Sequence, residues 1–132
     1  MIPSLIIQVD DDEINNFINE SVFKSNFKNT TVKSFVNPIK AVQFIKTEFI
    51  INPVPAAMFL DINMPEMNGW EILEALNVHL SIIEKYLPIY VVSSSIDSLD
   101  KYKSSVNPLI KAFLSKPISN QLIRDIFNVS SK

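Results

Sequence analysis

The chain has no cysteine and only one glycine among its 132 residues. Without cysteine it can form neither disulfides nor thiolate metal sites. Average glycine usage of roughly 7% would give about nine glycines in a chain of this length, and the phosphate-binding loops of P-loop and dinucleotide-binding proteins need several glycines close together. The glycine shortage therefore excludes both of these classes of nucleotide-binding protein.

The sequence also has no excess of positive charge and no long apolar run. Its formal net charge of -2 provides no basic field for nucleic acid or an anionic membrane. The first residues lack the basic segment of a signal peptide, and no apolar run approaches the roughly 18 residues of a membrane-spanning helix. We therefore expect a single cytoplasmic domain that has neither nucleic acid nor a membrane as its partner.

Four short apolar runs each lead into a polar side chain that can take part in chemistry. An apolar run closed by such a residue, and then by proline or glycine, is typical of a buried strand. The runs and the polar residues that follow them are residues 5–9 with Asp10 and Asp11, residues 56–60 with Asp61, residues 89–92 with Ser93, and residues 112–114 with Lys116. Because the carboxyl ends of parallel strands meet at one edge of a sheet, we expect these polar residues to share one site.

Helical patterns alternate with the predicted strands, and the β-branched stretch at residues 30–36 indicates a fifth strand. Helices are expected after Asp12, from Pro38, over residues 69–86, after Asp97 and over residues 118–129. The first of these helices carries an apolar face at helical spacing, formed by Ile14, Phe17, Ile18 and Val22. Five alternations of strand and helix predict an α/β fold with a doubly wound, five-stranded parallel sheet and five helices.

The acidic residues at the predicted edge indicate a magnesium site. Asp10, Asp11 and Asp61 cannot all ionise at close range unless a cation neutralises them, and Mg²⁺ prefers such oxygen ligands. Asp61 stands apart from the other acids and is the candidate nucleophile, because carboxylates form aspartyl phosphates. The Lys116 ammonium and the Ser93 hydroxyl can stabilise the oxygens of a transferred phosphoryl group. Each residue taken singly also fits an ordinary structural role, and it is their coincidence at one edge that favours phosphoryl transfer.

These residues resemble the motifs of the CheY-like receiver domain of two-component response regulators, which has a flavodoxin-like fold. The resemblance extends from Leu5 to about Phe127. Its motifs are VDDD at residues 9–12, LDINMPEMNG at residues 60–69, VSSS at residues 92–95 and SKP at residues 115–117. The resemblance predicts a single receiver domain over residues 1–132.

The resemblance also implies a role for each site residue. Asp61 is the expected phosphoacceptor. The expected Mg²⁺ ligands are Asp10, Asp11, Asp61 and the backbone carbonyl of Asn63, with Asp11 bound directly and Asp10 partly through water. The expected phosphoryl-binding and switch residues are Ser93, Lys116 and Phe113. The residues expected to tune dephosphorylation are Asn63 and Ser95. In the family, the peptide bond at the position of Lys116 and Pro117 is often cis.

Two positions depart from the common family pattern. Phe113 stands where many members have tyrosine, and it has no hydroxyl that could form a hydrogen bond outside the core. Residues 107–112 lack the glycine that many members carry before the last strand. These departures concern signalling and the shape of one turn, whereas the acidic positions are all occupied.

The resemblance implies a stand-alone receiver, which is not an enzyme beyond catalysing its own phosphorylation and dephosphorylation. It would accept a phosphoryl group on Asp61 from a histidine kinase or phosphotransfer protein and signal to a downstream protein. The surface expected to change comprises the fourth helix, the last strand and the last helix, with Tyr102, Leu109 and Ile110 as apolar contacts.

Two alternatives remain open from the residues. One is a receiver-shaped binding module that works without phosphate. The other is an aspartate-nucleophile phosphatase of the haloacid-dehalogenase kind, which typically needs a second acid two residues after the nucleophile. Asn63 stands there, and its amide has no titratable group.

Overall fold

The computed structural model describes residues 2–64, 67–94 and 97–128. In this part of the chain five parallel strands form one sheet in the order β2-β1-β3-β4-β5. The strands are β1 Leu5–Val9, β2 Thr31–Phe35, β3 Ala56–Asp61, β4 Ile89–Ser93 and β5 Ile110–Ser115. The predicted α/β class and the five-stranded parallel sheet are confirmed. Because β2 and β3 lie on opposite sides of β1, the strand order reverses there, and open α/β sheets bind ligands at such a point.

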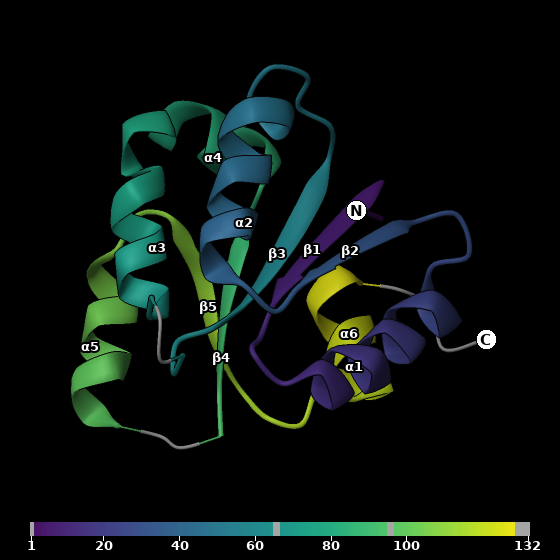
Figure 1. Ribbon diagram of the computed structural model, residues 1–132. Coiled ribbons are helices and arrows are strands. Elements are labelled where there is room, and N and C mark those ends of the chain that lie inside the picture. The colour runs from purple at the N-terminus through teal and green to yellow at the C-terminus, as the bar shows by residue number, and fades with distance from the viewer. Residues whose placement is uncertain (1, 65–66, 95–96, 129–132) are drawn as a thin grey trace.

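Helices cover both faces of the sheet, as Figure 1 shows. Their bounds are α1 Glu13–Asn26, α2 Pro38–Phe44, α3 Gly69–Leu76, α4 Leu80–Tyr86, α5 Ser98–Val106 and α6 Asn120–Phe127. α1 and α6 contact each other on one face, while α2, α3 and α4 cover the other face and α5 lies beside α3. A π-helical segment, η1 at Ile45–Phe49, extends α2.

The five predicted helical regions are present, with small differences in their bounds. The predicted helix at residues 69–86 is interrupted by a 3-10 turn, η2 at Asn77–His79, and therefore consists of α3 and α4. Asp12 and Asp97 cap α1 and α5 as predicted, since each side chain accepts hydrogen bonds from two backbone N–H groups of the helix that follows.

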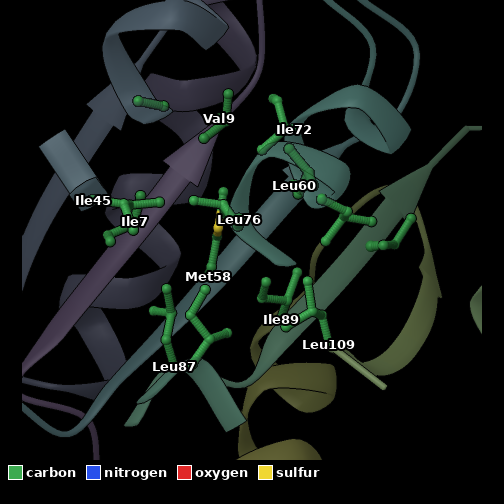
Figure 2. Close-up of a cluster of buried hydrophobic side chains, with 14 of the residues drawn as sticks. Ile7, Val9, Ile45, Met58, Leu60, Ile72, Leu76, Leu87, Ile89 and Leu109 are labelled. Atoms are coloured by element: carbon green, nitrogen blue, oxygen red, sulfur yellow. The ribbon is translucent and has the colours of Figure 1, made fainter. Parts of the chain in front are cut away.

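Two apolar clusters lie on the two faces of the sheet. The cluster under α2, α3 and α4 is aliphatic, and Figure 2 shows Ile7, Met58 and Leu60 of the sheet packed against Ile72 and Leu76 of α3. The cluster under α1 and α6 is aromatic and contains Phe23, Phe27, Phe59, Tyr90 and Phe127. β1, β3 and β4 are buried along their whole length, because helices cover them on both faces.

The apolar face that the helical spacing gives α1 does not lie against the core over the first half of the helix. Ile14 and Phe17 are each 72% exposed and Ile18 is 54% exposed, whereas Asn16 and Asn19 are buried with Phe23. The physical reason is that β1 presents the buried amide of Gln8 to α1, and this amide donates a hydrogen bond to the backbone carbonyl of Asn16 over 2.8 Å. The first half of the helix therefore turns Asn16 and Asn19 inward and leaves its apolar side chains in solvent, whereas Val22 and Phe23 further along pack against the aromatic cluster.

Candidate functional site

The site lies at the carboxyl edge of the sheet, where the strands deliver four side chains. Asp10 follows β1, Asp61 ends β3, Ser93 ends β4 and Lys116 follows β5. The strand register pairs Val9 with Leu60, Asp61 with Val92, and Ser93 with Ser115, so that the strand ends are level. The predicted gathering of these residues at one edge is therefore present in the structure.

Three carboxylates meet at this edge. Asp10, Asp11 and Asp61 each offer an oxygen atom, and these atoms all lie within 4.8 Å of one another. Asp10 and Asp61 are 5% and 7% exposed, while Asp11 is open to solvent. Hard oxygen ligands with several negative charges and an open side are the donor set that suits Mg²⁺. The residues present therefore fit the metal that the sequence predicts.

Lys116 holds the two buried carboxylates together. Its Nζ lies 2.9 Å from Asp10 Oδ2 and 3.5 Å from Asp61 Oδ2. The backbone N–H of Lys116 donates to the carbonyl of Ser93 over 2.9 Å, which ties the end of β5 to the end of β4. The Lys116–Pro117 peptide bond is cis, as it often is in the family that the sequence resembles.

Asp10 is the more acidic member of the buried pair. Burial raises the pKa of its carboxyl group, but hydrogen bonds from Lys116, from the backbone N–H of Asp12 and from the Asn15 amide, together with the charge of Lys116, lower the pKa below its usual value. The same pairing keeps Lys116 charged, because Asp10 and Asp61 raise its pKa in spite of burial, which lowers it.

Asp61 has the more basic carboxylate. Burial raises its pKa, and the nearby charge of Asp10 adds to this effect, while the backbone N–H of Asn63 and the Lys116 ammonium oppose it. The Asn63 N–H donates to Asp61 Oδ1 over 3.0 Å. Two neighbouring carboxyl groups with pKa values moved in opposite directions can take different roles, one as a metal ligand and one as a nucleophile.

The remaining predicted residues take the following places. The Asn63 amide donates to Ser93 Oγ over 3.3 Å, which brings these two residues together beside Asp61. Phe113 is half-buried in β5 opposite Val91 and packs against the aliphatic cluster. Ser95 lies outside the described residues, so its predicted role stays a prediction. Of the apolar contacts predicted for the output surface, Tyr102 is exposed on α5 and Ile110 is half-buried. The prediction for Leu109 was wrong, because this residue is 3% exposed and packs in the aliphatic cluster.

Sequence reasoning missed two amides that contact Asp10. The Asn15 amide donates to Asp10 Oδ2 over 2.5 Å, and the Asn16 amide donates to the backbone carbonyl of Asp10 over 2.9 Å. Both residues lie in the first turns of the helix that directly follows the acidic motif. Two adjacent asparagines at that place were the available signal, since a helix start next to a strand end brings such side chains back over it.

Comparisons with known proteins agree with this geometry. The family model described as the response regulator receiver domain matches residues 6–128. The structure of a two-component response regulator from Cytophaga hutchinsonii is similar, with 24% identity, 94% of this chain and 93% of that chain covered, and a TM-score of 0.84.

Two further solved structures share the fold. A response regulator receiver protein from Dyadobacter fermentans has 24% identity, coverage of 94% of each chain and a TM-score of 0.82. The Mn(2+)-bound form of response regulator Rcp1 has 19% identity, coverage of 98% of this chain and 97% of that chain, and a TM-score of 0.74. No curated protein sequence matches the chain. Across the described residues, no helix has both the length and the apolar character that crossing a membrane requires.

Proposed function

Because the chain belongs to the response regulator receiver domain family, we propose that it is a phosphoacceptor of two-component signalling and receives a phosphoryl group on Asp61. The observation that carries this proposal is the placement of Asp61 within 4.8 Å of two other carboxylates and 3.5 Å from Lys116. Receiver domains are signalling proteins, and the only catalysis we assign to this one is its own phosphorylation and dephosphorylation.

The acidic residues would hold Mg²⁺ in this reaction. The ligands we propose are the carboxylates of Asp10, Asp11 and Asp61 and the backbone carbonyl of Asn63. A divalent metal at these oxygens neutralises charge on the phosphoryl oxygens during transfer. The Mn(2+)-bound form of Rcp1, which shares the fold, supports a divalent cation in this role.

The chain's own residues account for the rest of the transfer. A carboxylate oxygen of Asp61 attacks phosphorus, the bond from phosphorus to the donor's histidine nitrogen breaks, and its electron pair returns to that nitrogen. Asp10 is the less suitable nucleophile, because the Asp12 N–H, the Asn15 amide and the Lys116 ammonium already bind its carboxylate oxygens. Lys116 and the Ser93 hydroxyl would then bind the oxygens of the phosphoryl group.

The donor would be a histidine kinase or a phosphotransfer protein, in the cytoplasm. α1 begins three residues after Asp10 and exposes Ile14, Phe17 and Ile18, which form an apolar surface beside the acidic site. An apolar surface of this kind marks a place where a protein partner binds. A donor protein seated there would have its histidine close to Asp61.

The output would leave through α5, β5 and α6. Phosphorylation gives Ser93 a new oxygen to bind, and Phe113, half-buried in the neighbouring strand, can change its packing in response. The modification shifts the protein between two arrangements only through such a difference in contacts. A downstream protein would then recognise the altered surface, on which Tyr102 is exposed.

An intact-mass experiment with acetyl phosphate and Mg²⁺ tests the proposed acceptor. The wild-type protein should gain one phosphoryl mass and Asp61→Asn should gain none. Asp97→Asn is the matched control, because it makes the same chemical change at an exposed helix cap where asparagine caps equally well. Labelling of Asp61→Asn at the wild-type level would remove Asp61 as the acceptor. A folded wild-type protein that takes no label would favour the binding module that works without phosphate.

The phosphatase alternative has little support in the site. Asn63 occupies the position of the second acid, and its side chain donates a hydrogen bond to Ser93 instead of offering a titratable group.

A further inference from the structure

A series of buried amide hydrogen bonds joins β1 to α1 directly behind the acidic site. The Asn16 side-chain amide donates to the backbone carbonyl of Asp10 over 2.9 Å. The Gln8 side-chain amide donates to the backbone carbonyl of Asn16 over 2.8 Å and to Ser34 Oγ in β2 over 2.7 Å. Asn16 and Gln8 are 4% and 2% exposed, so both amides lie away from bulk water. We call this series the amide bridge.

The amide bridge carries a cost for stability beside the three hydrogen bonds that it forms. Gln8 Oε1 and Asn16 Oδ1 are buried and have no hydrogen-bond partner among the described residues. A buried polar atom without a partner loses its hydration and gains nothing in return, whereas an apolar side chain of similar size has no such loss. Ile6, two residues before Gln8 on the same face of β1, is apolar and fully buried. Packing alone would therefore favour apolar residues at positions 8 and 16.

The atom that the amide bridge holds belongs to the metal site. The carbonyl bound by Asn16 is part of the planar peptide that joins Asp10 to Asp11, so its orientation determines where both acidic side chains start. The Asp10 carboxylate is then fixed by the Asp12 N–H and by Lys116. Gln8 also borders a small cavity of about 10 Å³ that Asp10, Asp61 and Lys116 line as well.

We propose that Asn16, supported by Gln8, is a positioning residue for the Asp10–Asp11 acidic pair. This inference rests on the magnesium-dependent function proposed above. It gives a functional reason for the two buried amides, whose unpaired oxygens do not contribute to stability. Without the amide bridge, the peptide between Asp10 and Asp11 is free to rotate, and the carboxylates must be ordered when the metal binds. Loss of the amide bridge therefore lowers the affinity for Mg²⁺, while apolar side chains at positions 8 and 16 keep β1 and α1 packed together.

The test compares metal affinity with stability in matched variants. Asn16→Leu and Gln8→Leu replace an amide with an apolar side chain of similar size, and Ile6→Val is the control, because it removes one buried methylene on the same face without touching an amide. Mg²⁺ affinity is measured by calorimetry and stability by urea unfolding in the absence of metal. Both leucine variants should bind Mg²⁺ about tenfold more weakly, the low end of the effect of losing a partner that supports metal ligands. They should lose no more stability than Ile6→Val, because each loses the hydrogen bonds of its amide together with an oxygen that has no partner. Ile6→Val should lose stability and keep its Mg²⁺ affinity.

A second readout follows the acidic site without metal. The Asp12 amide proton is bonded to Asp10 Oδ1 at an N–O distance of 3.0 Å, and its resonance should move upfield in Asn16→Leu and stay in place in Ile6→Val. The Gln8→Leu/Asn16→Leu double variant should bind Mg²⁺ about as weakly as either single variant, because the two residues act through the same bonds. If Gln8→Leu fails to fold, Gln8→Met retains an unbranched side chain and takes its place.

The outcomes separate this inference from the proposed function. In one outcome the wild type takes a phosphoryl group and binds Mg²⁺, and both leucine variants bind Mg²⁺ as tightly as the wild type. This result would overturn the positioning role and leave the proposed phosphoacceptor function in place. In a second outcome the Mg²⁺ affinity falls in proportion to the loss of stability in every variant, Ile6→Val included. This result would show that the amides have an ordinary structural role, and it would also overturn the positioning role. A wild-type protein that neither binds Mg²⁺ nor takes a phosphoryl group would overturn both.

Discussion

Replacing Lys116 with methionine should destabilise the metal-free protein by an amount that depends on pH. The Lys116 Nζ lies 2.9 Å from Asp10 and 3.5 Å from Asp61, and both carboxylates are nearly buried. Two unit charges about 4 Å apart attract by about 4 kcal/mol at an effective dielectric constant of about 20. Because the lysine side chain is 22% exposed, water replaces part of the lost solvation. We expect a loss of about 3 kcal/mol near neutral pH, at the low end of the cost of breaking a buried ion pair.

The pH dependence follows from the direction of each pKa shift. The lowered pKa of Asp10 gives stability that is present above the pKa of an unfolded aspartate, about 3.9, and is lost as the pH falls through the folded value. The raised pKa of Lys116 gives stability that is present below the unfolded lysine value, about 10.4, and is lost as the pH rises through the folded value. In the methionine variant burial dominates, so the pKa of Asp10 rises and protonation at low pH relieves the unpaired charge. The difference between the two proteins should therefore be large near neutral pH and should shrink as the pH falls through the folded pKa of Asp10, which lies below its usual value.

Urea unfolding in the presence of a chelator measures this difference, with the fluorescence of the chain's single tryptophan, Trp70, as the probe. Lys111→Met is the control, because Lys111 is an exposed lysine in β5, the strand that Lys116 follows, and its replacement should change stability by less than about 0.5 kcal/mol. Mg²⁺ should restore part of the loss in Lys116→Met, by about 1.4 kcal/mol at a free concentration of about ten times its dissociation constant. An equal loss of stability at neutral and acidic pH would mean that Lys116 acts through packing, and would refute the electrostatic argument.

Two further predictions concern the helices on either side of the site. Gly69→Ala should cost about 2 kcal/mol in urea unfolding, because a Cβ there would lie 2.7 Å from the Ile62 backbone, which already accepts the Gly69 N–H. Unchanged stability would mean that the Ile62 backbone shifts away from the new methyl group without cost. Phe17→Ser should leave stability within about 0.5 kcal/mol and labelling by acetyl phosphate unchanged, yet slow transfer from a phosphohistidine protein, because Phe17 is 72% exposed beside the site. Equal slowing with both donors would contradict a docking role.

The position of the site was predictable because it depends on strand ends. A short apolar run that stops at a charged or hydroxyl residue identifies a buried strand and its carboxyl end, and a parallel sheet then brings such ends to one edge. This reasoning places Asp61, Ser93 and Lys116 at one edge, and the register of β3, β4 and β5 brings the ends of these strands level. The edge strand β5 was predicted too short, since Lys111 and Ser115 on its exposed positions break the apolar run.

The orientation of α1 was not predictable from hydrophobic spacing. Residues 14, 17 and 18 and residues 16, 19 and 23 both follow the helical period, so the pattern allows either face to turn inward. Hydrophobicity favours the first set, and the structure has the second. The choice depends on Gln8, whose buried amide needs polar partners across the interface between β1 and α1, and a single-sequence pattern does not contain that tertiary contact.

The inverted α1 connects the two proposals through one arrangement of the helix. With the amides of Asn15 and Asn16 turned toward Asp10, the helix start supports the acidic site, and the same rotation places Phe17 in solvent beside that site. One rotation would thus serve the proposed metal binding on the inner side and offer the proposed donor protein an apolar contact on the outer side. The loss of apolar burial near the start of α1 is offset further along, where Phe23 packs against Phe59, with ring centroids 4.8 Å apart. The second half of α1 therefore packs the helix against the sheet. The residues of its first half contribute little to that packing and can be suited to the acidic site and to a binding partner instead.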